Sequence, residues 1–115
     1  MIKKILNNFL LLSFLFCLSS NAVTSKKLEP DHCQKIIAFT LYNYDNLITD
    51  FYEKKQPYLK QLAFLIDQAS SIPEEVIFEQ LRKNPDLAIQ TTPLQLMLQV
   101  NKMLKAHHTY YFVDD

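Results

Sequence analysis

The chain has 115 residues, its twelve basic side chains are balanced by twelve acidic ones, and it contains no glycine. This length allows a single domain. The lack of glycine excludes P-loops, dinucleotide-binding loops and nucleophile elbows, because each needs glycine where the backbone turns sharply or approaches a ligand. It also favours helices separated by proline over hairpins, whose tight turns commonly use glycine. The basic residues form no block, so nucleic acid is not expected as a partner.

Residues 1–22 have the layout of a secretory signal peptide. Lys3 and Lys4 form a positive head, an apolar run extends from Phe9 to Leu18, and small residues precede a cleavage point after Ala22. We therefore expect a cleaved signal and an exported protein, periplasmic or secreted, of bacterial type. The mature chain would carry ten basic and twelve acidic side chains, a formal charge of −2, and no membrane association is expected after cleavage.

Two other fates of this segment are considered. One is retention as an anchor, which the short apolar run disfavours because a membrane span needs about 20 apolar residues. The other is lipidation at Cys17, which Phe16 disfavours because that signal usually places a small residue before the cysteine. Cleavage leaves Cys33 as the single cysteine. In an oxidising compartment it would be a buried free thiol, a mixed disulfide or an intermolecular disulfide in a homodimer.

The rest of the chain predicts an all-α fold. Residues 23–30 are polar and are expected to be a flexible leader, followed by a single helical domain over 31–115 that ends in an extended aromatic tail. Apolar residues recur at helical spacing, and prolines and capping residues mark the boundaries. The expected bundle has three to four helices, at about 31–55, 57–70, 72–83 and 93–107.

Particular start signals set these boundaries. Asp31, Ser71 and Thr92 are predicted N-caps, each close to a proline. Pro57 either kinks one long helix or separates two, because proline inside a helix removes a hydrogen bond and clashes with the preceding turn. The helix that begins at Pro93 is the most apolar and is expected at the centre of the bundle. The tail after it is β-prone, but a lone strand has no expected partner in a helical bundle.

The first helix is amphipathic, and two aromatic residues lie on its polar side. On its buried side we expect Cys33, Ile36, Ile37, Thr40, Leu41, Tyr44, Leu47, Ile48, Phe51 and Tyr52. Phe39 and Tyr42, three residues apart, lie on the face that otherwise carries Asn, Asp and Lys. Either another element of the bundle covers them, or they form a surface for a protein partner. They are the candidate partner surface.

His32, Cys33, His107 and His108 are the set of residues that could bind a transition metal or form a nucleophilic pair. Neighbours on a helix point about 100° apart, so His32 and Cys33 cannot chelate well by themselves. Zinc sites normally show paired ligands at short fixed spacings, and none is present. We therefore assign no catalytic, cofactor-binding or metal-binding residue, and expect Cys33 on the apolar stripe and His107 at a helix end.

These observations favour a non-enzymatic protein-interaction module, such as an inhibitor, an immunity-type protein, a chaperone or an assembly factor. Its partner would be an unidentified protein, and no cofactor is expected. One alternative is a carrier of a lipid or another apolar ligand, suggested by the wide apolar girth and the methionines of the last helix. The other is a small metal-binding protein or enzyme that uses the histidine and cysteine set.

Overall fold

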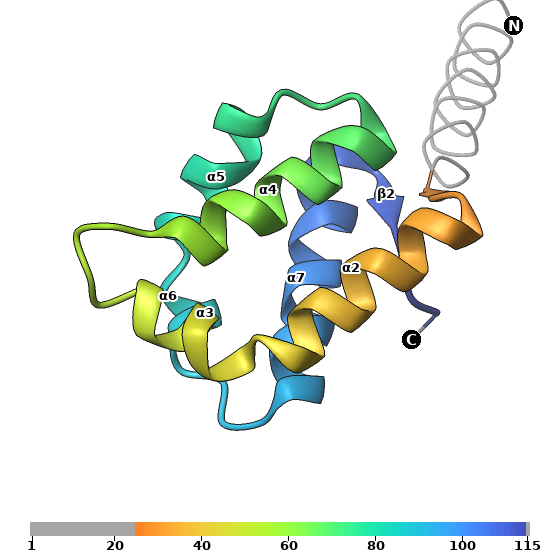
Figure 1. Ribbon diagram of the computed structural model, residues 1–115. Helices are drawn as coiled ribbons and strands as arrows, with labels where there is room; N and C mark the ends of the chain where they lie inside the picture. Colours follow the sequence, from red (N-terminus) through yellow and green to blue (C-terminus); the bar gives the residue numbers. More distant parts are fainter. Residues whose placement is uncertain (1–24, 115) are drawn as a thin grey trace, which may run out of the picture.

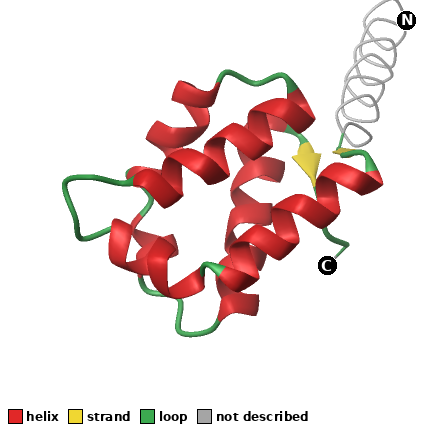
Figure 2. Ribbon diagram, viewed as in Figure 1, coloured by secondary structure: helices red, strands yellow, loops and turns green. Residues whose placement is uncertain are grey.

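A computed structural model describes residues 25–114, and within this range six helices and two short strands form a small bundle (Figure 2). The prediction of an all-α bundle is confirmed. The expected signal peptide and Cys17 lie outside the described residues. The elements are β1 (Lys26–Lys27), α2 (Pro30–Tyr42), α3 (Tyr44–Asp50), α4 (Pro57–Ser70), α5 (Glu74–Arg82), α6 (Pro85–Ala88), α7 (Pro93–His108) and β2 (Tyr110–Tyr111).

The helices enclose one apolar core. α4 packs against α2, α3 and α5, while α7 packs against α2 and α6 (Figure 1). Burial of apolar side chains is the main favourable contribution to folding, and α7 supplies five of the buried apolar side chains. The fully or nearly fully buried apolar residues are Leu28, Cys33, Ile36, Leu47, Leu59, Leu62, Ala63, Ile66, Ile77, Leu81, Leu87, Leu96, Met97, Val100, Met103, Leu104 and Phe112.

The predicted helix over 31–55 is two helices and a loop. α2 ends before Asn43, whose backbone (φ −109°, ψ 23°) leaves the helical region and whose amide donates to the Phe39 carbonyl at 3.1 Å. Asparagine competes with the helix in this way, because its short side chain bonds to nearby backbone groups. α3 ends at Asp50, so Tyr52 leaves the expected buried stripe and is 73% exposed.

Pro57 separates two helices and does not kink one. It is the first residue of α4, where its missing N–H would be unpaired in any case. The start of α4 is capped from a distance: the Asp50 carboxylate accepts the backbone N–H groups of Tyr58 at 2.7 Å and Leu59 at 3.0 Å. The buried Gln56 side chain donates to the Asp50 carbonyl at 2.9 Å. Asp50 therefore ties together the two ends of the loop over 51–56.

Of the three predicted N-caps, only Thr92 is confirmed, with its hydroxyl accepting the Gln95 N–H at 3.1 Å. Asp31 lies inside the first turn after Pro30 and makes no cap hydrogen bond. Ser71 ends α4 in the left-handed conformation (φ 62°), a position that glycine usually takes. The Asp67 carboxylate accepts the N–H of Glu74 at the start of α5, at 2.9 Å.

The two ends of the described chain lie side by side, which corrects two expectations. β1 and β2 pair in parallel, with Lys26 opposite Tyr110 and Lys27 opposite Tyr111. The Leu28 N–H extends the ladder to the Tyr111 carbonyl at 2.9 Å. The tail therefore has a strand partner, and that partner lies in the segment expected to be a flexible leader. We call residues 26–28 together with 109–114 the terminal clasp.

Candidate functional site

The two residues of the predicted partner surface have different environments. Tyr42, at the end of α2, is 88% exposed. Phe39, one turn earlier, is partly buried and packs against the core. Both residues belong to α2, but Tyr42 is the last residue of the helix, whereas Phe39 lies one turn inside it. The candidate partner surface therefore depends on Tyr42.

Tyr42 borders an open groove of about 520 Å³ between α2 and the beginning of α7. We call it the α2 groove. Its lining is mostly apolar, and two of the lining side chains are exposed, Tyr42 to 88% and Leu41 to 38%. Contiguous exposed apolar side chains of this size are typical of interaction sites. The residues that line the groove are Gln34, Ile37, Ala38, Leu41, Tyr42 and Pro93.

A second hollow, of about 630 Å³, lies where the loop over 51–56 meets α5, and it is rich in positive charge. Lys54 and Lys55 come from the loop, Lys60 from α4 and Arg82 from α5. The Lys60 ammonium lies over the ring of Phe78, 5.6 Å from its centroid. We call this site the basic hollow.

The one carboxylate that lines the basic hollow is already paired. Glu79 accepts Arg82 at 2.8 Å and Lys83 at 3.1 Å, and the hydrogen bond from Arg82 lowers the pKa of Glu79. In the part of the chain that the structure describes, the ion pairs do not include Lys54, Lys55 or Lys60. Lys54 and Lys55 are thus left without an ion-pair partner among the described residues.

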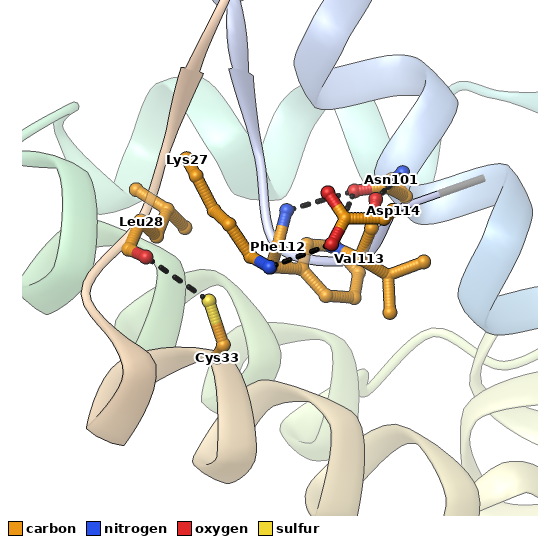
Figure 3. Close-up of polar contacts among 7 residues, drawn as sticks. All are labelled: Lys27, Leu28, Cys33, Asn101, Phe112, Val113 and Asp114. Carbon is orange, nitrogen blue, oxygen red and sulfur yellow. Dashed lines mark hydrogen bonds and ion pairs between the residues drawn. The ribbon is translucent and has the colours of Figure 1, made fainter.

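Cys33 lies beneath the terminal clasp and is a free thiol, 5% exposed (Figure 3). Its sulfur donates to the Leu28 carbonyl at 3.2 Å, and burial raises the pKa of the thiol. The ion pair between Lys27 and Asp114, at 2.8 Å, joins the two segments of the clasp above it. The intermolecular disulfide stays a prediction, and it requires the clasp to open first, because the sulfur is covered.

The clasp is fastened to α7 by Asn101, which is fully buried. Its side-chain oxygen accepts the N–H groups of Phe112 at 2.8 Å and Val113 at 3.2 Å, and its amide donates to the Val113 carbonyl at 3.0 Å (Figure 3). Sequence reasoning missed this residue. The sequence does carry a signal for it: Asn101 is a polar residue on the apolar side of the last helix, four residues after Met97 and three before Leu104.

The histidine and cysteine set does not form a metal centre in the described residues. His108 is hydrogen-bonded to Gln80 at 2.7 Å, and burial, followed by the charge of His107, lowers its pKa. His107 is exposed at the end of α7, and His32 is partly buried. Across residues 25–114, no three His, Cys, Asp or Glu side chains gather closely enough to hold a metal ion.

Comparisons with family models, curated proteins and solved structures find no match to this chain. Among the described helices, none combines the length and the apolar composition that crossing a bilayer requires.

Proposed function

We propose that the protein is an exported, non-enzymatic interaction module that binds a protein partner in the α2 groove. The observation that carries this proposal is Tyr42, an aromatic side chain 88% exposed at the edge of an apolar groove. Tyrosine is enriched at binding hot spots because it offers a large apolar area and a polar hydroxyl. A helix with an apolar face is the partner segment that such an open groove suits.

The environment of Cys33 supports the non-enzymatic part of the proposal. A nucleophilic cysteine needs an accessible thiolate, and the raised pKa of the buried Cys33 thiol disfavours one. The packing of α7 favours an interaction module over a lipid carrier, because Met97 and Met103 contribute to the core between the helices.

The test compares two exposed tyrosines. A photo-crosslinking amino acid at position 42 should join the protein to its partner in an extract of the native host, and the same group at position 52 should not. Tyr42→Ala should abolish capture of that partner, whereas Tyr52→Ala should keep it, because Tyr52 is 73% exposed but does not line the groove. Both variants should melt like the wild type. Equal capture by the two variants would contradict the proposal.

Export has its own test, since it depends on the predicted signal and not on the groove. The intact mass of the protein recovered from its native host should correspond to a chain that begins at Val23. A mass that retains residues 1–22 would show that the segment is kept, and would remove the export part of the proposal while leaving the groove unaffected.

A further inference from the structure

We propose that the basic hollow is half of a self-complementary surface, through which two copies of the chain associate with their α5 helices antiparallel. This inference is independent of the α2 groove, which lies on other helices. It starts from the order of charges along α5. Glu74 and Glu75 are in the first turn, Phe78 is in the middle and partly buried, and Arg82 is in the last turn with Lys83 as C-cap.

The helix dipole alone explains acidic residues at one end of α5 and basic residues at the other. It does not explain Lys54 and Lys55, which come from the neighbouring loop and lie beside the basic end. Since Glu79 is occupied by Arg82 and Lys83, the ion pairs of the described residues leave these two lysines without a carboxylate. The surface therefore has an excess of positive charge that an incoming acidic group would balance.

The ligand must also match the other end of the surface. Glu74 and Glu75 line an adjoining hollow of about 250 Å³ together with Phe78 and Lys60. A uniformly anionic ligand, such as a nucleic acid strand or an anionic membrane, would meet these two carboxylates, and like charges brought together in an interface weaken association. A segment that complements this surface places an acidic end against the basic hollow and a basic end against Glu74 and Glu75.

The chain itself contains such a segment, namely α5. When two copies meet about a two-fold axis, each presents the same patch to the other, and an antiparallel pair places the acidic end of each α5 against the basic end of its partner. Glu74 and Glu75 of one copy then face the lysines of the other, and the two-fold axis repeats the same set of contacts with the copies exchanged. The loop is held for this contact in advance, because Asp50 and Gln56 tie its ends together.

The experiment is a charge swap followed by sedimentation equilibrium, in reductant so that Cys33 cannot link the copies. The wild type should be a dimer that weakens as salt rises, because salt screens exposed charges. Glu74→Lys with Glu75→Lys, and separately Lys54→Glu with Lys55→Glu, should each weaken the dimer by roughly a hundredfold through repulsion. A mixture of the two double variants should restore dimers. All four positions are exposed, so the variants should stay folded, and the lysines introduced at positions 74 and 75 should lower the melting temperature only slightly by opposing the dipole of α5.

The matched control is Lys35→Glu with Lys102→Glu, which makes the same change in net charge at exposed sites on α2 and α7. It should leave the dimer intact. A wild type that stays monomeric at all concentrations, a control as damaging as the loop variants, or a mixture that stays monomeric would each overturn the proposal. Binding of the wild-type monomer to phosphatidylserine vesicles would instead assign the basic hollow to a lipid surface.

Discussion

Replacing Asn101 with alanine is expected to weaken the fold mainly by releasing the C-terminal tail from α7. The side chain makes three hydrogen bonds to tail backbone groups, at 2.8, 3.0 and 3.2 Å, and is fully buried. A hydrogen bond contributes about 0.5–1.5 kcal/mol to stability, so their loss should lower the free energy of unfolding by about 3 kcal/mol. In a domain of this size that corresponds to a melting temperature lower by roughly 12–24 °C.

The assay is urea denaturation followed by circular dichroism, because the chain has no tryptophan to report by fluorescence. A second readout is the rate at which Cys33 reacts with a thiol reagent under native conditions. It should rise in the alanine variant, since a loosened tail uncovers the sulfur. Lys102→Ala, at the next and exposed position of α7, is the control. The reasoning is refuted if Asn101→Ala stays within about 0.5 kcal/mol of the wild type and its thiol reacts no faster.

Three further predictions test other parts of the fold. Asp50→Ala should lower the free energy of unfolding, measured by urea denaturation, by about 2 kcal/mol, because it frees the start of α4. The control Asp45→Ala, at an exposed position, should lower it little. Equal decreases in the two variants would show that Asp50 does not cap α4. The pKa of His108 is lowered in the fold, so stability should fall as pH drops below 6.5, where the unfolded chain binds the proton first. The decrease in the free energy of unfolding between pH 6.5 and lower pH should be smaller in His108→Gln than in the wild type. An equal decrease in the two proteins would contradict the prediction. Leu104→Asp should unfold the domain, since Leu104 is fully buried. A circular dichroism spectrum and a melting curve like those of the wild type would refute the placement of Leu104 in the core.

The parts of the fold that sequence predicted are those with local causes. Pro93 begins a helix because proline suits the first helical position, and Thr92 caps that helix with its own hydroxyl. At Pro57 the sequence left a kink and a break open, and the structure has the break. The apolar stripe of the last helix also identified the buried face, because its period is a property of the sequence alone.

The missed features depend on residues far apart in the chain. Asp50 caps a helix nine residues away across a loop, in place of the cap next to the proline that sequence rules seek. The strand pair joins positions 26 and 110, each strand only two residues long, too short to give an alternating pattern. At the candidate site, helical spacing placed Phe39 and Tyr42 together, but Phe39 packs against the core and Tyr42 alone of the two is exposed, because packing by other elements cannot be read from the spacing.

The terminal clasp has a consequence for the order in which the protein can complete its structure. A chain is synthesised from its N-terminus, so β1 is made long before its partner β2. The contact between Lys27 and Asp114 spans 87 positions, and closing so long a loop has an entropic cost that favours helix packing first. Until the tail arrives, Leu28 and the Cys33 thiol lack their cover. The Cys33 thiol is therefore open to reagents until β2 pairs with β1.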